Sequence, residues 1–244
     1  MIEHHLDLPT ADGAMNSFVV HPDEGGPHPV VLFYMDAPGK REELHDMARR
    51  IASVGYCVVL PNLYYRQRRE YELKERTPEK MAEMFGLMQS LNRATTETDT
   101  RALLAYVDAL PAADATRLGA VGYCMSGPFV VWAAAAFPER FACIAAIHPA
   151  NLATDAADSP HRVAAQLRCE SYFGCAEIDQ WAPPKDVAAL ENGLKQSGRP
   201  HRVEWYPKVE HGFSFPKRPA YDRDAAERHY ERLFSLFDRR LRGR

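Results

Sequence analysis

The alternation of short apolar runs with helical patterns constrains the fold of this chain more than any other feature. Strand-like runs occupy residues 28–36, 56–64, 117–123, 141–148, 168–174 and 201–207. Helical patterns cover 41–54, 78–91, 95–110, 184–197 and 222–241, and another directly follows Cys124. Unbroken apolar strands separated by helices are typical of a mostly parallel sheet covered on both faces. We therefore expect an α/β fold, preceded by an antiparallel hairpin over 2–8 and 14–20.

Size and charge narrow the class of protein. The 244 residues contain no internal repeat and no Gly/Ser linker, which predicts a single domain over residues 1–244. A net charge of -3 gives no global attraction to nucleic acid or to an anionic membrane, so neither is an expected partner. No apolar run approaches the ~18 residues of a membrane span, and the N-terminus lacks a signal-peptide pattern. We therefore expect a cytoplasmic protein, either a monomer or a homodimer.

The cysteines follow no disulfide or metal-ligand spacing. They are five in number: Cys57, Cys124, Cys143, Cys169 and Cys175. Cys57, Cys143 and Cys169 lie in or beside apolar strand-like runs, which favours buried, reduced thiols. The chain therefore predicts neither a disulfide framework nor a metal site.

Cys124 has a different setting, on a bend between a strand and a helix. The stretch "GYCMSG" follows the strand over 117–123 and precedes a helix, as in a nucleophile elbow. Such a bend needs small residues around the nucleophile; Gly122 fits, and Ser126 stands where a glycine is usual. The N–H groups at the helix start also favour a thiolate.

Two other interpretations of Cys124 remain open at this point. A cysteine at a strand end is often only a small buried apolar residue. The bend also resembles a dinucleotide-binding GxGxxG turn, with Cys124 in place of the middle glycine. That replacement blocks close approach of a pyrophosphate, and the next strand runs into His148 rather than an acid. The catalytic interpretation therefore needs partners elsewhere in the chain.

A base and an acid follow Cys124 in the order that the elbow requires. His211, in "VEHGFSFP", comes after the strand over 201–207 and before the last helix. The segment "YFGCAEIDQWAPP" offers two acids, Glu177 and Asp179. Counting from the strand favours Glu177, whereas counting back from Pro183 favours Asp179. We expect Asp179 to be the partner of His211 and keep Glu177 as the alternative.

With these motifs the chain resembles the dienelactone hydrolase family, a cysteine-nucleophile branch of the α/β-hydrolases. The resemblance extends from "HPVVLFYMDAPG" through "GYCVVLPNLYYR" and "GAVGYCMSG" to "EHGFSFP". It implies an α/β-hydrolase fold and a triad of Cys124, Asp179 and His211. It also implies an oxyanion hole formed by the backbone N–H groups of Met125 and Ala37.

Asp36 departs from the family pattern at a position next to the thiol. Familiar members carry there a glutamate that contacts and activates the resting thiol. Asp36 is one methylene shorter, so the resemblance implies a thiol-activating role through a different geometry or through water. The alternative is that Asp36 caps the turn in "PGKREEL".

The resemblance also places the substrate pocket. Where family members hold a substrate carboxylate with arginines, this chain has Met81 and Phe215, with Phe85 and Met88 nearby. These residues indicate an apolar pocket wall, or equally a core stripe at helical spacing. Tyr64 and Tyr65 follow a strand end and are candidates for the edge of the site, or equally for ordinary surface packing. Three cations are candidates to replace the missing arginines: Lys80, Lys217 and Arg218.

The sequence thus predicts a hydrolase of a carboxylic ester or lactone that works through an acyl-thioester. Its substrate is expected to be a small molecule less anionic than a dienelactone. No metal or organic cofactor is required by this chemistry. The alternatives are a ligand-binding protein that keeps the fold without catalysis, and acyl-transfer or thioester chemistry on the same scaffold.

Overall fold

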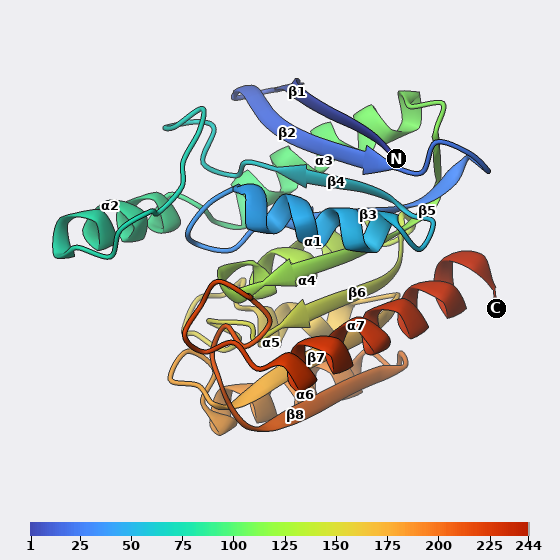
Figure 1. Ribbon diagram of the computed structural model, residues 1–244. Helices are drawn as coiled ribbons and strands as arrows, with labels where there is room; N and C mark the ends of the chain where they lie inside the picture. The colour runs from blue at the N-terminus through green and yellow to red at the C-terminus, as the bar shows by residue number, and fades with distance from the viewer. Residues whose placement is uncertain (244) are drawn as a thin grey trace. The chain divides into compact units, whose positions relative to one another are not determined.

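The computed structural model describes residues 1–243 (Figure 1). The contacts within the chain divide it into two compact units. Unit 1 is Met1–Thr116 and unit 2 is Arg117–Arg244. Strands alternate with helices along the chain as the apolar pattern predicts. The single domain over 1–244 stays a prediction, and each unit is described by itself.

Unit 1 is built on four strands in the order β1-β2-β4-β3. Their bounds are β1 Ile2–Thr10, β2 Gly13–His21, β3 His28–Tyr34 and β4 Cys57–Pro61. The predicted hairpin is present as the antiparallel pair β1 and β2, while β3 and β4 are parallel. Strands β3 and β4 are buried almost throughout, because helices cover this sheet. The parallel pairing of β3 with β4 therefore agrees with the prediction from their apolar runs.

Three helices belong to unit 1: α1 Glu42–Ala52, α2 Pro78–Gln89 and α3 Arg93–Ala109. Helix α1 packs on β2 and β4 through Leu44, Met47 and Ile51, which lie on one helical face. Helix α3 contacts β1. It starts with a capping box in which the Asn92 side chain accepts the Thr95 N–H. Local signals thus fix where the helix begins.

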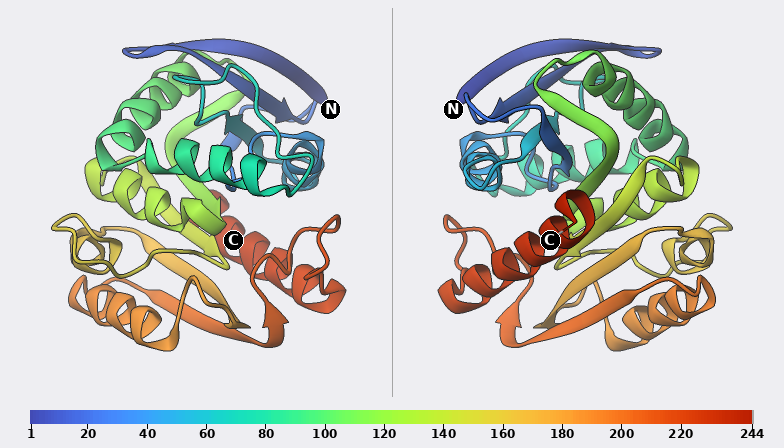
Figure 2. Two further views of the ribbon diagram at one scale, coloured as in Figure 1. Left: turned by 90° about the vertical axis from the view of Figure 1, so that its left-hand side faces the viewer. Right: turned by 90° about the vertical axis from the view of Figure 1, so that its right-hand side faces the viewer.

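Unit 2 contains four parallel strands in the order β5-β6-β7-β8. Their bounds are β5 Ala113–Tyr123, β6 Phe141–Ile147, β7 Glu170–Ile178 and β8 His201–Glu210. Its helices are α4 Gly127–Ala136, α5 Pro160–Val163, α6 Pro184–Gln196 and α7 Arg223–Phe237. Figure 2 shows α7 on one face of this sheet and α4 and α6 on the other. The carboxyl ends of these strands carry the residues of interest below.

The structure differs from the sequence prediction in several places. The helix predicted over 222–241 is α7 as far as Phe237, and a π-helical turn, Asp238–Arg242, follows it. Helix α5 and the 3-10 turn Ala164–Gln166 were not predicted, because each is too short to show a helical period. Strand β5 begins at Ala113 rather than at residue 117. Strands β7 and β8 run on to Ile178 and Glu210, since these two residues pair after a register irregularity. Within residues 1–243, no helix has both the length and the apolar character that crossing a membrane requires.

Candidate active site

Cys124 lies on a strained bend at the carboxyl end of β5. Its φ is 55°, in the left-handed region that residues other than glycine rarely adopt. A 3-10 turn, Cys124–Ser126, leads directly into α4. The Ala150 N–H donates to the Cys124 carbonyl over 2.9 Å, which helps to hold the bend. The thiol is partly exposed, so the geometry has the form of a nucleophile elbow.

Two glycines allow the bend to close. A Cβ on Gly122 would lie 2.4 Å from the backbone oxygen of Ser126. A Cβ on Gly127 would lie 2.4 Å from Cβ of Pro149. Sequence reasoning asked for small residues at 122 and 126; the close approach at Gly127 was missed. The "CMSG" spacing contains that glycine, so the signal was present in the sequence.

His211 and Asp179 are brought together from the ends of β8 and β7. The Nδ1 atom of His211 lies 2.7 Å from Oδ2 of Asp179. The Asp179 side chain is 1% exposed and that of His211 is 14% exposed. The other Asp179 oxygen accepts the Trp181 N–H over 2.8 Å. The carboxylate is therefore held at both oxygens, and one ring nitrogen of His211 is fixed.

The second ring nitrogen of His211 is available to the thiol. Nε2 is buried and has no hydrogen bond of standard geometry within residues 1–243. Burial disfavours a charged ring, but the interactions with Cys124 and Asp179 outweigh it and raise the pKa of His211 to about 10. Because Asp179 occupies Nδ1, the Cys124 interaction involves Nε2. The arrangement favours an imidazolium between a carboxylate and a sulfur.

Glu177 has another partner. It lies within β7, not after the strand as the sequence reasoning assumed. Its exposed carboxylate accepts the Lys208 N–H over 2.7 Å, at a point where Lys208 has a φ of 61°. Of the two candidate acids, Asp179 contacts His211 and Glu177 supports an irregular turn in β8.

Asp36 and Ala37 lie in unit 1, after β3. The Asp36 carboxylate is fully buried and binds Arg41, with Nη1 to Oδ1 at 2.5 Å and Nη2 to Oδ2 at 3.3 Å. It is the Asp36 carbonyl, not the side chain, that accepts the Gly39 N–H of the turn. Tyr64 donates its hydroxyl to the Ala37 carbonyl over 2.9 Å. The thiol-activating role of Asp36 and the oxyanion role of Ala37 stay predictions.

Arg41 is a residue that sequence reasoning did not single out. Besides Asp36 it binds the buried Glu43, with Nη2 to Oε2 at 2.6 Å. Burial opposes the charge, yet the two carboxylates raise the pKa of Arg41. In the sequence, Arg41 is marked only as a basic residue within the "PGKREEL" turn.

The predicted pocket residues fall into two groups. On α2, Met81, Phe85 and Met88 are half-buried and share one side of the helix. In unit 2, Phe215 is fully buried, with its ring 5.7 Å from that of Tyr123. Their place in a substrate pocket stays a prediction, as does the oxyanion role of the Met125 N–H, which lies in the turn after Cys124.

The three candidate cations have different settings. Lys80 is exposed and lies 3.8 Å from Glu83. Lys217 is exposed. The Arg218 guanidinium stacks on Phe215 at 4.5 Å from the ring centre, and a Cβ on Gly212 would lie 3.1 Å from it. Arg218 therefore contacts the turn that carries His211.

His148 is a further residue that sequence reasoning noted only as the end of a strand. It is fully buried, and its ring centre lies 5.0 Å from that of His211 in an edge-on arrangement. Its Nε2 atom lies 2.7 Å from Oγ of Ser214. The only sequence signal was a histidine directly after an apolar strand.

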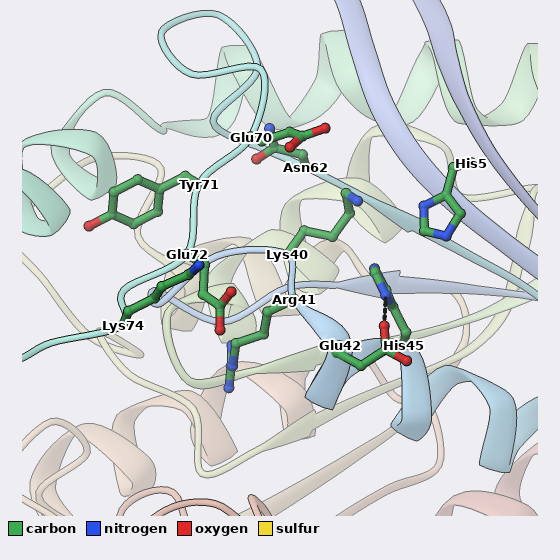
Figure 3. A pocket seen from close by; sticks show the side chains of 10 residues that line it. All are labelled: His5, Lys40, Arg41, Glu42, His45, Asn62, Glu70, Tyr71, Glu72 and Lys74. Atoms are coloured by element: carbon green, nitrogen blue, oxygen red, sulfur yellow. Dashed lines mark hydrogen bonds and ion pairs between the residues drawn. The ribbon is translucent and has the colours of Figure 1, made fainter.

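Unit 1 holds a separate polar pocket of about 400 Å³ (Figure 3). Its walls include lysines and glutamates, so their charges largely offset one another. Ten residues line it: His5, Lys40, Arg41, Glu42, His45, Asn62, Glu70, Tyr71, Glu72 and Lys74. His45 Nδ1 lies 2.9 Å from Glu42 Oε2, as drawn in Figure 3. None of the residues predicted for the active site lines this pocket. Within residues 1–243, no cluster of three or more His, Cys, Asp or Glu side chains is arranged to hold a metal ion.

Comparison with protein families identifies the family of this chain. A model of the dienelactone hydrolase family matches residues 15–241. The chain belongs to the dienelactone hydrolase family. This confirms the resemblance drawn from "GYCMSG" and "EHGFSFP", and with it the expectation of a carboxylic ester hydrolase.

Individual curated relatives are distant but match nearly the whole of this chain. A provisionally named carboxymethylenebutenolidase of Synechocystis sp. is 25% identical over 97% of this chain and 96% of its own. One of Methylorubrum extorquens is 26% identical over 97% of this chain and 81% of its own.

Solved structures share the fold. A provisionally assigned dienelactone hydrolase from Klebsiella pneumoniae superposes with a TM-score of 0.86 at 22% identity, covering 97% of this chain and 98% of its own. A dienelactone hydrolase-like promiscuous phosphotriesterase from metagenomic libraries gives 0.80 at 18% identity, covering 98% of each chain. The expected α/β-hydrolase fold is thereby confirmed.

Proposed function

We propose that the protein hydrolyses a carboxylic ester or lactone with Cys124 as nucleophile, His211 as base and Asp179 as the acid that orients His211. The observation that carries the proposal is the 2.7 Å contact between His211 Nδ1 and Asp179 Oδ2, in a ring whose pKa both Cys124 and Asp179 raise. A ring held in this way has one tautomer and one free edge, which is what a hydrolytic triad needs. Membership of the dienelactone hydrolase family supports the same class of reaction.

The first half-reaction forms an acyl-thioester. His211 takes the thiol proton, or already holds it as an imidazolium beside the thiolate, and Cys124 Sγ attacks the carbonyl carbon. The raised pKa of His211 supports a charged ring in the resting enzyme. As the C–S bond forms, the carbonyl oxygen becomes an oxyanion. When the intermediate collapses, the C–O bond to the leaving alcohol breaks and His211 Nε2 returns the proton to that oxygen.

The second half-reaction releases the acid. His211, now neutral, removes a proton from water, and the resulting hydroxide adds to the thioester carbonyl. The C–S bond then breaks, and Cys124 leaves as a thiolate beside the imidazolium. With a lactone, the alcohol stays attached to the acyl group throughout, so a single hydroxy acid leaves at the end.

The remaining predicted groups have a proposed role in these steps. The backbone N–H groups of Met125 and Ala37 would stabilise the oxyanion, and the bond from Tyr64 to the Ala37 carbonyl holds that peptide in one orientation. Asp36 would act on the resting thiol, with Arg41 fixing its carboxylate. The half-buried Met81, Phe85 and Met88 would favour a less anionic substrate than a dienelactone. No metal or organic cofactor enters any step.

The decisive experiment is turnover of p-nitrophenyl acetate and simple lactones by the wild type, Cys124→Ala and Cys124→Ser. We expect turnover by the wild type and none above background by Cys124→Ala. Cys124→Ser should be strongly impaired, because a serine hydroxyl is far less ionised than a thiol at the same site. Trapping by acid quench should give an acyl group on Cys124 by mass spectrometry.

The alternatives make different predictions. A ligand-binding protein would turn over no ester or lactone, and Cys124 would resist iodoacetamide near neutral pH. An acyl-transfer enzyme would form the thioester but release it to an added thiol or alcohol much faster than to water. Either result would lead us to abandon hydrolysis as the function.

A further inference from the structure

His148 links the segments that carry the three proposed catalytic residues. It directly follows β6, between the ends of β5 and β7. Its backbone N–H donates to the Gly174 carbonyl on β7 over 2.7 Å. Its ring lies 5.9 Å from that of Tyr123, the residue before Cys124. A single residue thus borders the strands that lead to Cys124 and Asp179, with its ring beside Tyr123 and its backbone N–H on Gly174.

The side chain of His148 is joined most directly to the loop that carries His211. Nε2 shares a 2.7 Å hydrogen bond with Oγ of Ser214, three residues after His211. The ring also meets those of His211, Phe213 and Phe215 edge-on, at centre distances of 5.0, 5.4 and 5.2 Å. His148 is therefore packed against His211 and bonded to the same loop.

The backbone of His148 has a strained conformation at this position. Its φ is 36°, in the left-handed region that residues other than glycine rarely adopt. Strain of this kind persists only where surrounding contacts impose it. Here the Gly174 bond and the Ser214 bond fix the residue from its backbone and from its side chain.

The charge state of His148 also suits a place beside His211. Complete burial lowers the pKa of His148 well below its usual value, and the nearby His211 lowers it further. The ring is therefore neutral and puts no second positive charge beside the imidazolium of His211. Its Nδ1 atom is buried with no hydrogen-bond partner within residues 1–243. A buried nitrogen without a partner destabilises the folded state, and a phenylalanine of similar size avoids this cost.

We propose that His148 is a positioning residue, which holds the His211 loop through Ser214 and sets the orientation of the His211 ring through edge contact. The inference rests on the catalytic role proposed for His211. A positioning role implies that loss of the His148–Ser214 bond tilts His211 away from the thiol. This tilt should raise the energy of the transition state more than it weakens substrate binding, because it changes the geometry of proton transfer.

Three variants test this role by different routes. His148→Phe keeps a ring but removes Nε2, Ser214→Ala removes the partner, and His148→Gln can place an amide nitrogen where Nε2 was. We expect kcat to fall about 10- to 100-fold in the first two, with KM within about twofold, and His148→Gln to recover part of kcat. Because both substitutions break one bond, the double variant His148→Phe/Ser214→Ala should lose no more than the worse single variant.

A second readout does not depend on turnover. The ring signals of His211, followed by NMR, should titrate closer to pH 6.5 in His148→Phe and Ser214→Ala than in the wild type, since a tilted ring loses contact with Cys124 and Asp179. Ser159→Ala is a matched control, because Ser159 Oγ bonds His161 Nδ1 at the same 2.7 Å distance in α5. That control should leave kcat and the His211 titration unchanged.

The outcomes separate the two proposals. If the wild type has no esterase activity, the proposed function fails while the His211 titration still tests His148. If the wild type is active, unchanged kcat and titration in His148→Phe and Ser214→Ala would overturn the positioning role. A raised KM with normal kcat would also overturn it, as that would make His148 a substrate-binding residue. If His148→Phe does not fold, Ser214→Ala and His148→Gln decide by the same two readouts.

Discussion

His211 and Asp179, from the ends of two adjacent parallel strands, are joined by a 2.7 Å contact between Nδ1 and Oδ2. Glu177 is only two residues away from Asp179, yet it is exposed and bonded to the Lys208 N–H. Two neighbouring carboxylates thus have different partners. One sets the state of the ring beside Cys124, and the other supports a turn of the backbone.

Replacing these two acids should have unequal effects. Asp179→Asn can donate an N–H toward His211 and so favours the wrong tautomer; we expect kcat to fall about 10²- to 10⁴-fold. Glu177→Gln still offers an oxygen to Lys208 and should change kcat by no more than about twofold. Steady-state kinetics with p-nitrophenyl acetate measure both. Equal, mild effects would remove Asp179 from the mechanism.

The titration of His211 gives a second prediction. Although burial opposes it, Cys124 and Asp179 raise the pKa of this ring to about 10, above the ~6.5 of an unfolded chain. The folded state therefore gains stability from the charged ring fully below about pH 6.5 and loses it as pH rises toward 10. NMR should report a midpoint far above 6.5 that falls in Cys124→Ala and Asp179→Asn.

Urea unfolding checks the same linkage from the stability side. The difference in unfolding free energy between the wild type and His211→Gln should be larger at pH 6 than at pH 10.5. A midpoint near 6.5, or a difference that does not depend on pH, would contradict the raised pKa.

The order of strands and helices was predictable because it depends on local periodicity. Buried strands such as β3 and β4 show as apolar runs, and α1 shows its buried stripe in the same way. The ends of β7 and β8 were not predictable, since the pairing of Ile178 with Glu210 extends them beyond their apolar runs. That extension is why Glu177 was expected in a loop.

The site was predictable where it depends on local sequence and not where it depends on distant contacts. Cys124 and His211 lie in short motifs on predicted strand ends. The choice between Asp179 and Glu177 required the contact across β7 and β8. Arg41 and His148 were missed because their importance comes from partners, and Ser214 is 66 residues from His148.

Thiol labelling should single out Cys124. Burial raises the pKa of Cys57, Cys169 and Cys175 to about 12, and that of Cys143 well above its usual value. All four are buried, whereas Cys124 is partly exposed. Iodoacetamide at pH 7.5 should therefore modify one cysteine in the native protein and five in urea, by mass spectrometry. Native labelling of another cysteine at a comparable rate would contradict this.

Arg218 should matter for substrates that carry a carboxylate. Its guanidinium lies beside Gly212 and over Phe215, next to the turn of His211. Arg218→Ala should raise KM about tenfold for an ester with a free carboxylate, because one charged hydrogen bond is lost. The KM for a neutral ester of the same length should not change. Lys195→Ala, at an exposed residue beside Glu191, serves as the control. An equal effect on both esters would exclude a carboxylate-binding role.

The glycines at the Cys124 bend give the last prediction. A Cβ at Gly122 would meet the Ser126 backbone oxygen at 2.4 Å, and one at Gly127 would meet Pro149 at 2.4 Å. Backbone must shift to relieve either contact, so Gly122→Ala and Gly127→Ala should each lower the free energy of unfolding by about 1–3 kcal/mol. Because the shift moves Cys124, esterase activity should fall as well, even where the variant is fully folded.

Gly86→Ala is the matched control for these variants. Gly86 lies in α2 with nothing within 4 Å of an added Cβ, so alanine should stabilise the helix by about 0.5–1 kcal/mol. Urea unfolding and esterase assays on all three variants separate the effect of close approach from that of glycine replacement itself. Gly122→Ala and Gly127→Ala could instead have the unfolding free energy and the esterase activity of the wild type. The bend would then tolerate an added Cβ at both glycines. The strained position of Cys124 would then not be what activity requires.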